Sequence, residues 1–536
     1  MTVEHLFDQR GSVSGLTLTA DVLVIGGGPA GAWAALLAAA QGAKVVLVEK
    51  GFLGTGGATA AGNTTTIHTL PGSDEREAAI QRRMAQAFGL AKQDWVERII
   101  EDAFIHLNEL ADWGYPFPST EDGVSYRGSL RGADYLRFMR RLLRKADVKV
   151  LDKSPALELL TSDGVVVGAA GTNRVSHERW TVRSGAVVVA TGGCAFRSNA
   201  LGTNGLTGDG YLLSAEAGAV FSGMEFTGQY GIAPAFSSVT KGIIYFWATF
   251  TDADGNVLER KGDRQAAVAR HLMTGPVYAV LDQASPRVQE GMRRGQPNIF
   301  VPFDRKRIDP FTQRFPITLR YEGTVRGVGG LVIDATGATT VPGLFAAGDA
   351  ASRENFVGAT TGGGGPNSSW AMSTGARAGQ AAAAFAAALG LRAQERRAQP
   401  AGVIGLRPAG PIDKELRVAD VIAAVQQEIL PLDRSYFRTG AALAASQERL
   451  NDLWREARAG FSASGDEVSD VREAASMIAT ARWIVASAMG RPESRGINRR
   501  LDFPNTDPAQ QHRLTAGGLD KVWVEPETAM PRAMAS

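Results

Sequence analysis

Residues 21–50 constrain the fold more than any other part of the sequence. An apolar run, DVLVI, occupies 21–25, and a turn of the form GxGxxG follows at 26–31. An alanine-rich stretch then covers 32–41, and a second apolar run, KVVLVE, covers 44–49. Short apolar runs next to glycine are typical of buried strands, and the longer alanine-rich stretch is typical of a helix. This order predicts the βαβ unit of a dinucleotide-binding fold.

Each residue of the turn has its own expected role. Gly26 permits the tight turn, Gly28 lets the backbone approach a pyrophosphate, and Gly31 lets the helix pack closely on its strand. The phosphates then lie at the helix N-terminus, which carries a partial positive charge. Glu49 ends the second strand, where its carboxylate can accept hydrogen bonds from the ribose of an adenosine. Glycine turns also join strands to helices without a ligand, but here strand, helix, second strand and acid are all present.

Two later segments add to this pattern. The apolar run AVVVA at 186–190 is followed by a TGG turn, and the run LFAA at 344–347 is followed by Gly348 and Asp349. Both segments resemble the strands and turns of flavoproteins with two dinucleotide-binding motifs. Asp349 is placed to bind ribitol hydroxyls, and the alternative for this acid is a solvated turn.

Four further motifs extend the resemblance along the chain. They are LTGDG at 206–210, MEF at 224–226, VGGL at 328–331 and RPESRGINR at 491–499. With the segments above, they resemble the flavoprotein subunits of the succinate dehydrogenase and fumarate reductase family, which also includes L-aspartate oxidase and the flavin subunit of adenylylsulfate reductase. The resemblance covers nearly the whole chain and implies FAD as the cofactor.

The resemblance also implies the architecture. The fold class is α/β, with a Rossmann-like (two-dinucleotide) FAD-binding domain, an inserted α+β capping domain and a C-terminal helical bundle. Within these, strand-like runs are expected at 242–250 and 298–303, and amphipathic helices at 412–430, 441–457 and 469–489. The expected boundaries are 15–224 and 326–391 for the FAD-binding domain, 225–325 for the capping domain, 392–411 for a linker, 412–500 for the helical domain and 501–536 for a tail.

The residues expected to contact FAD lie in the glycine turn, at strand ends, in the small-residue loop at 55–62 and after the glycine run 362–365. A helix is expected to begin there at Pro366, with its N-terminus at the N1–C2=O edge of the flavin. The alternative is a surface loop. The full set is Gly26, Gly28, Ala30, Gly31, Glu49, Lys50, Thr55, Gly56, Gly57, Ala58, Gly62, Ala156, Ala190, Thr191, Gly192, Asp209, Gly348, Asp349, Asn367 and Ser368.

The chain departs from the family pattern at three places that matter for chemistry. Gly57 stands where membrane-bound members carry the His that links to the flavin, so FAD is expected to be non-covalent. Tyr230 replaces the substrate-binding His, and the glycine run 362–365 replaces the segment with the carboxylate-binding Arg. Because both ligands of a dicarboxylate are lost, succinate and fumarate are rejected as physiological substrates.

Three residues are candidates for catalysis. Arg264 falls near the family's catalytic Arg, although the local order here is Asp263-Arg264. Arg326 precedes the VGGL strand, and the hydroxyl of Tyr230 can orient or protonate a substrate. Each also has a structural interpretation, which for Arg264 is an ion pair on a helix surface.

Composition narrows the remaining classes. The chain has 57 Lys and Arg against 55 Asp and Glu and no basic stripe, so nucleic acid is not an expected partner. Cys194 is the single cysteine, which excludes an internal disulfide and an iron–sulfur cluster held wholly by this chain. No metal site is expected. Because no segment suits a secretion signal or a transmembrane span, the expected location is the cytoplasm.

These features predict an FAD-dependent dehydrogenase or reductase that moves a hydride between flavin N5 and a small organic substrate. Three alternatives stay open. They are an oxidase that returns electrons to oxygen, a flavin subunit of an adenylylsulfate-reductase-like complex with a separate iron–sulfur protein, and a flavin-binding protein without turnover. The sequence does not identify the substrate, the direction of the reaction or the oligomeric state.

Overall fold

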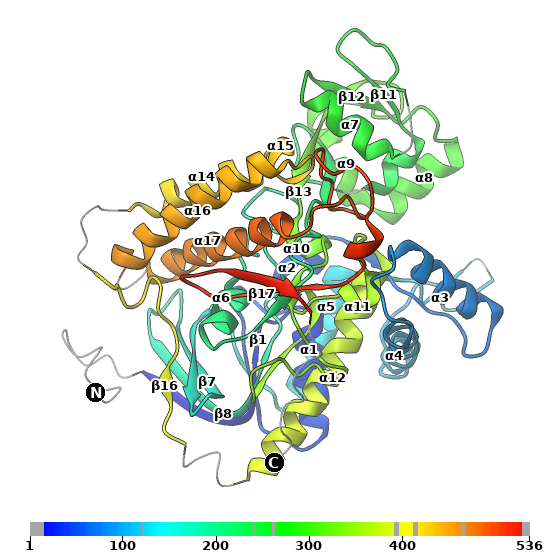
Figure 1. Cartoon of the computed structure of the whole chain (residues 1–536). Helices are drawn as coiled ribbons and strands as arrows, with labels where there is room; N and C mark the ends of the chain where they lie inside the picture. Colours follow the sequence, from blue (N-terminus) through cyan, green and yellow to red (C-terminus); the bar gives the residue numbers. More distant parts are fainter. Residues whose placement is uncertain are drawn as a thin grey trace.

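The computed structural model describes residues 15–120, 122–240, 242–259, 263–390, 396–410, 416–461, 463 and 467–527. These residues form three regions in Figure 1: a large sheet flanked by helices, a smaller capping region in green, and long C-terminal helices in orange. Together they confirm the α/β class. Within these ranges, no helix has the length and apolar character needed to cross a membrane.

The largest sheet carries the predicted βαβ unit. Its strand order is β16-β6-β7-β8-β1-β2-β5, with β15 paired to β8. The strands β1, β2, β5, β8 and β15 are parallel to their neighbours in this set, so their carboxyl ends meet at one edge. Their bounds are β1 (Leu16–Ile25), β2 (Val45–Val48), β5 (Lys149–Leu151), β6 (Ala156–Ser162), β7 (Val165–Thr172), β8 (Arg179–Val189), β15 (Leu344–Ala346) and β16 (Gln399–Pro400).

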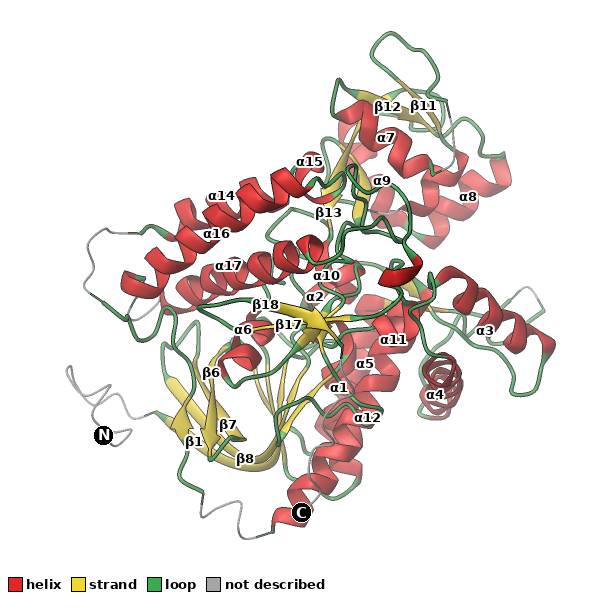
Figure 2. Cartoon of the chain, viewed as in Figure 1, coloured by secondary structure: helices red, strands yellow, loops and turns green. Residues whose placement is uncertain are grey.

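Two helices, α1 (Pro29–Ala40) and α12 (Gly365–Leu389), pack side by side against this sheet (Figure 2). Two glycines of α12 permit the contact. A Cβ atom at Gly375 would lie 2.4 Å from the carbonyl oxygen of Ala30, and one at Gly379 would lie 2.1 Å from that of Ala34. The same region contains α2 (Gly57–Ala60), β3 (Asn63–Thr65), α3 (Asp74–Gln86), α4 (Gln93–Asp112), β4 (Ser129–Arg131), α5 (Gly132–Lys145) and α6 (Asp209–Glu216).

The capping region is built on the antiparallel sheet β10-β13-β12-β11 and has its own apolar core. Its short helix α10 connects it back to the region of the large sheet. The bounds are β10 (Tyr230–Pro234), η2 (Gly242–Trp247), β11 (Thr249–Thr251), α7 (Arg264–Leu272), β12 (Val277–Val280), α8 (Pro286–Gly295), α9 (Pro297–Lys306), β13 (Phe315–Tyr321) and α10 (Gly323–Arg326).

Two strands expected in this region are wrong. The run 298–303 lies inside helix α9, because Pro297 starts the helix and the buried residues Ile299, Phe300 and Phe303 share one helical face. The run 242–250 begins as the 3-10 helix η2, and only its end belongs to strand β11. A short apolar run alone does not distinguish a strand from a buried helix. For the run 298–303, the proline directly before it was the signal for a helix.

Three C-terminal helices are found near the expected positions: α14 (Val418–Ile429), α16 (Gly440–Gly460) and α17 (Val468–Met489), with α15 (Leu432–Ser435) between the first two. The first was expected from residue 412, but α14 begins at Val418, and 411–415 lie outside the described residues. Helix α17 is buried on nearly every residue, because it lies between the other long helices and α6. Trp454 and Trp483 belong to the core.

Part of the expected tail joins a small sheet. Strands β17 (Leu514–Gly517) and β18 (Trp523–Pro526), labelled near the centre of Figure 2, extend a sheet that also contains β9 (Phe221–Ser222) and β14 (Gly330–Leu331). The remaining elements are η3 (Gly348–Ala350), α11 (Glu354–Val357) and η5 (Pro508–Gln510).

Candidate functional site

One elongated pocket runs along the carboxyl ends of the parallel strands. Of the residues expected to contact FAD, all but Gly31, Thr55 and Gly62 line it. Residues that the sequence did not single out complete the wall. They are Ile25, Gly27, Pro29, Val48, Gly51, Thr59, Thr64, Tyr135, Ser154, Pro155, Arg174, Gly205, Leu206, Leu213, Ala347 and Ala371.

The glycine turn has the geometry that a pyrophosphate requires. Gly26 has a φ of +106°, and a Cβ there would lie 2.4 Å from the carbonyl oxygen of Ala190. A Cβ at Gly28 would meet no atom within 4 Å, and no side chain caps helix α1 at this residue. The unpaired N–H groups at the start of α1 are therefore open to an anion in the pocket.

Gly31 supports the turn without lining the pocket. A Cβ there would lie 1.8 Å from the carbonyl oxygen of Gly26, so the close approach of helix and turn depends on glycine. The two other exceptions lie in the neighbouring loop. The hydroxyl of Thr55 donates to the carbonyl oxygen of Phe52, and the carbonyl oxygen of Gly62 accepts from the N–H of Gly132.

Glu49 is held rigidly at the end of β2. One carboxylate oxygen accepts from the N–H of Gly27 at 2.6 Å, and the other accepts from the N–H of Gly51 at 2.7 Å. A carboxylate oxygen can accept a second hydrogen bond. Glu49 therefore has the free acceptor capacity that ribose hydroxyls would use.

Beside it, Lys50 connects the pocket to the C-terminal helices. Its Nζ lies 2.6 Å from Asp209 and 3.1 Å from Glu473, a buried residue of α17. Burial lowers the pKa of Lys50, but the two carboxylates outweigh it and leave the pKa above its ordinary value. Arg174 also pairs with Glu473, so this end of the pocket is closed by a partly buried ion network.

The opposite end of the pocket is formed by η3 and by the start of α12. Gly364 precedes the helix with a φ of +79°, and Pro366 occupies its first turn, as the sequence predicts. Asn367 and Ser368 line the pocket from this turn, and Asp349 lines it from η3. Burial raises the pKa of Asp349, and the adjacent Arg353 acts against that shift.

These features fit an elongated ligand with two phosphates in its middle and hydroxyl groups on both sides. Comparison with known proteins points to the same ligand. Residues 21–230 match the model of a family described as an FAD binding domain, and residues 426–528 match one described as the fumarate reductase flavoprotein C-term.

Relatives match along nearly the whole chain. An L-aspartate oxidase of Mycobacterium leprae is 30% identical, over 91% of this chain and 93% of its own. The chain therefore belongs to the family of FAD-dependent oxidoreductases that includes L-aspartate oxidase and the fumarate reductase flavoprotein subunits. A fumarate reductase flavoprotein subunit of Mycobacterium tuberculosis is 28% identical, over 92% of this chain and 93% of its own.

Solved structures agree on the fold of this flavoprotein. A quinol-fumarate reductase has a TM-score of 0.81 at 20% identity and covers 97% of this chain and 99% of its own. An adenylylsulfate reductase of Archaeoglobus fulgidus has a TM-score of 0.75 at 18% identity, with 97% of both chains covered. The expected fold and FAD as the cofactor are therefore confirmed.

The three catalytic candidates of this flavoprotein lie in different surroundings. Arg326 is beside the glycine run, where its Nη1 would lie 3.9 Å from a Cβ at Gly363, and its Nε lies 3.1 Å from Glu322. None of the three candidates is among the residues that line the pocket. The hydroxyl of Tyr230 donates at 2.9 Å to the carbonyl oxygen of Leu430, so it contacts the C-terminal helices.

Arg264 belongs to the capping region. Its Nη1 donates at 2.6 Å to the carbonyl oxygen of Tyr245, and its guanidinium lies 4.6 Å from the ring centre of Phe246. These contacts tie the start of α7 to η2. Among the three candidates, Arg326 is therefore the one that the fold brings next to the glycine run.

Two residues near the pocket were missed from the sequence. Glu322 is buried at the start of α10, with its carboxyl carbon 3.1 Å from the Cβ position of Gly231. Arg353 is completely buried beneath Asp349 and the glycine run. The sequence signal for Arg353 was its position only four residues after Asp349. A charged residue at that distance is equally compatible with an exposed position, so the signal did not predict burial.

Proposed function

We propose that this flavoprotein is a dehydrogenase or reductase that moves a hydride between flavin N5 and a small organic substrate other than succinate or fumarate. The exclusion of these two acids is supported by Tyr230. The sequence resemblance aligns Tyr230 with the family's substrate-binding His, and its hydroxyl is directed to the carbonyl oxygens of Leu430 and Pro431. A dicarboxylate loses that ligand.

The glycine run supports the same exclusion and also leaves space. The sequence has no arginine between Thr360 and Asn367, where the family pattern has its carboxylate-binding Arg. A Cβ at Gly363 or Gly365 would meet no atom closer than 3.4 Å, so packing within the described chain leaves room for a side chain at both positions. We infer that the space next to these two glycines belongs to a substrate bulkier than a C4 dicarboxylate.

The residues that hold FAD follow from the pocket. The start of α1 binds the pyrophosphate, Glu49 the adenosine ribose, Asp349 the ribitol, and the first turn of α12 the flavin ring. When bound, FAD supplies the hydride donor or acceptor. The family resemblance of the VGGL segment and the position of Arg326 beside the glycine run support a proton-transfer role for Arg326, with Glu322 as its ion-pair partner.

We expect FAD to be bound without a covalent link. Gly57 has no side chain that can bond to the flavin, and it lines the pocket with a φ of +76° at the start of α2. Precipitation of the purified protein with acid should release all the yellow colour into the supernatant. Flavin that remains in the washed pellet would contradict the proposal.

We also expect succinate oxidation and fumarate reduction to be weaker than in the dicarboxylate-specific relatives by a factor of at least 30. Each missing carboxylate ligand costs about 2–5 kcal/mol when its site is buried, and a factor of ten corresponds to about 1.4 kcal/mol. Anaerobic addition of a panel of acids, alcohols and ketones, followed by flavin bleaching at 450 nm, measures the preference directly. Rapid bleaching by succinate would overturn the substrate part of the proposal.

A separate protein can act as the electron partner. The relative from Mycobacterium tuberculosis is named a flavoprotein subunit, and Cys194 is the one cysteine of this chain. An iron–sulfur cluster would therefore have to be carried by another chain. Another relative is named an L-aspartate oxidase, which indicates oxygen as its electron acceptor. Hydrogen peroxide formed during turnover would distinguish an oxidase from an enzyme that passes its electrons to a protein partner.

A further inference from the structure

Arg353 lies where three segments of the pocket wall meet. It follows η3 and precedes α11, and no part of its side chain is exposed. A buried guanidinium requires an acceptor for each of its five N–H donors, because an unpaired one costs free energy. The surroundings of Arg353 supply all five.

One edge of the guanidinium faces the pocket residues. Its Nη1 donates to Oδ1 of Asp349 at 2.7 Å and also to Oδ1 of Asn367. Asp349 belongs to η3 and Asn367 to the first turn of α12, and both line the FAD pocket. One nitrogen therefore fixes two pocket side chains that come from different elements.

The other edge binds the end of α10. Its Nη2 donates to the carbonyl oxygens of Thr324 at 2.7 Å and Val325 at 3.0 Å, and its Nε donates to that of Gly327 at 3.0 Å. These are carbonyls that a short helix leaves unpaired at its end. The same turn carries Arg326, so Arg353 joins the catalytic candidate to the cofactor wall.

The glycine run is shaped around this side chain. A Cβ at Gly362 would lie 2.7 Å from both Cδ and Nε of Arg353. The packing of Arg353 therefore explains why position 362 is a glycine. At Gly363 and Gly365, by contrast, no atom of the described chain comes close enough to require a glycine.

We propose that Arg353 is a positioning residue of the FAD site, which holds the carboxylate of Asp349 in place at the pocket wall. The proposal rests on FAD binding and is independent of the substrate. Lysine cannot replace it, because one ammonium group cannot reach acceptors on two opposite sides as a planar fork does.

Other groups around Asp349 determine how strongly the protonation of its carboxyl group depends on Arg353. The hydroxyl of Tyr211, on α6, donates to the backbone carbonyl of Asp349 at 2.7 Å and leaves the carboxylate free. Arg326 is the second cation that lowers the pKa of Asp349, and Asn367 adds a hydrogen bond. Since burial acts in the opposite direction, removal of Arg353 shifts the balance toward the protonated acid.

The test is a double-mutant cycle of Arg353→Gln and Asp349→Asn, with the dissociation constant of FAD measured from pH 6 to 8.5. Arg353→Gln should weaken FAD binding about tenfold to a hundredfold, which corresponds to one or two charge-assisted hydrogen bonds. The loss should grow toward the acid end of this range, because without Arg353 the balance around Asp349 moves toward the protonated acid. In the Asp349→Asn background the same change should cost much less and show no pH dependence.

A merely structural role would look different. It would lower the stability of the FAD-free and FAD-bound proteins equally, whereas a positioning role reduces the rise in the thermal unfolding midpoint that FAD produces. Arg482→Gln is the matched control, because Arg482 is also buried and donates to an amide oxygen of Asn451 and to the carbonyl oxygens of Leu519 and Asp520. It should destabilise the protein and leave the FAD-induced rise unchanged.

If Arg353→Gln does not fold, Arg353→Lys takes its place in the cycle. It keeps the positive charge, so FAD should bind more weakly with a pH profile close to that of the unmodified protein. Two outcomes overturn the proposal: unchanged FAD affinity in the Arg353 variant, or losses that simply add between Arg353 and Asp349.

Discussion

Replacement of Glu493 by Gln is expected to lower the apparent free energy of unfolding by about 3–5 kcal/mol, the cost of breaking a buried ion pair by removing one partner. Glu493 has no exposed surface. Its Oε1 accepts from Arg491 at 3.0 Å and from Arg495 at 2.6 Å, and its Oε2 accepts from Arg495 at 3.1 Å and from the N–H of Asp507 at 2.8 Å. Gln cannot neutralise either guanidinium.

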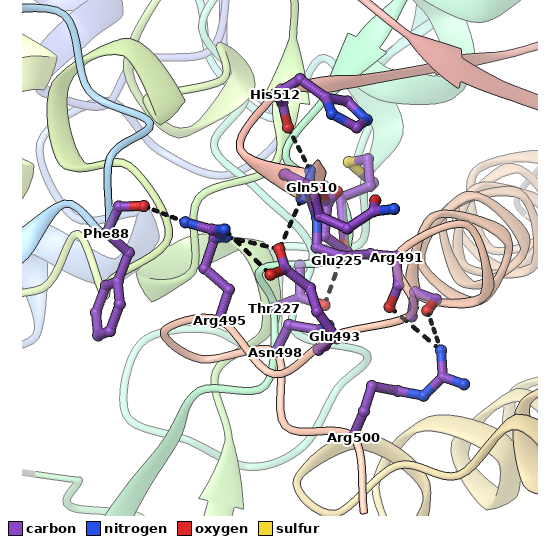
Figure 3. Close-up of polar contacts among 12 residues, drawn as sticks. Phe88, Glu225, Thr227, Arg491, Glu493, Arg495, Asn498, Arg500, Gln510 and His512 are labelled. Atoms are coloured by element: carbon purple, nitrogen blue, oxygen red, sulfur yellow. Dashed lines mark hydrogen bonds and ion pairs between the residues drawn. The ribbon is translucent and has the colours of Figure 1, made fainter. Parts of the chain in front are cut away.

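The loss would spread through the network in Figure 3. Arg491 also binds the carboxylate of Glu225 at 2.7 Å, so the loop after α17 is tied to the turn that precedes β10. The same loop packs on the segment before the glycine run, where a Cβ at Gly496 would lie 2.0 Å from the carbonyl oxygen of Ala359. The charge at position 493 therefore stabilises a loop that packs directly against the segment before the glycine run.

Urea unfolding followed by circular dichroism measures the effect. Asp134→Asn is the matched control, because Asp134 also pairs with an arginine, Arg137, at 2.9 Å, but both side chains are largely exposed. Its effect should stay within about 1 kcal/mol. A loss in Glu493→Gln no larger than in this control would show that the buried network contributes little to stability.

Local sequence patterns were enough to predict the cofactor end of this molecule. The turn at 26–31 works through neighbouring residues: the positive φ of Gly26, the contact of Gly31 with the turn and the acid at position 49 all follow from spacing along one βαβ unit. Helix α12 was predictable for the same reason, since Pro366 follows the glycine run directly.

The contacts of Tyr230 and Arg353 could not be predicted in the same way, because they join residues that are distant in sequence. Tyr230 donates to a carbonyl 200 residues later, and Arg353 donates to carbonyls 26 to 29 residues before it. A motif fixes the type of residue at a position but not the direction of its side chain. The strands expected at 242–250 and 298–303 failed for a related reason, since burial of a short apolar run fits helix and strand alike.

A second large effect is expected from pH. Burial and the neighbouring Glu225 raise the pKa of Glu354 to about 8, against the opposing charges of Arg513 and Arg491. The side chain has no exposed surface. In the unfolded chain, the same group has an ordinary pKa of about 4.3. Between these two values, the folded state holds a proton that the unfolded state has lost.

The stability of the protein should therefore fall as pH rises from about 5 to 8, by up to about 1.4 kcal/mol per pH unit from this group. Glu354→Gln keeps the shape and stays neutral at every pH, so the variant should be more stable than the unmodified protein at pH 8 and lose most of that slope. Thermal unfolding midpoints at pH 6, 7 and 8 measure both effects.

Glu428→Gln is the control of opposite sign. Burial acts to raise the pKa of Glu428, but hydrogen bonds from Arg449 and Ser446 outweigh it and hold the pKa below its ordinary value. The loss of this carboxylate should therefore lower stability by the same amount at all three pH values. A slope between pH 6 and 8 that is the same with and without Glu354 would mean that its carboxyl group is ionised in the folded protein, and that the arginines around it outweigh burial.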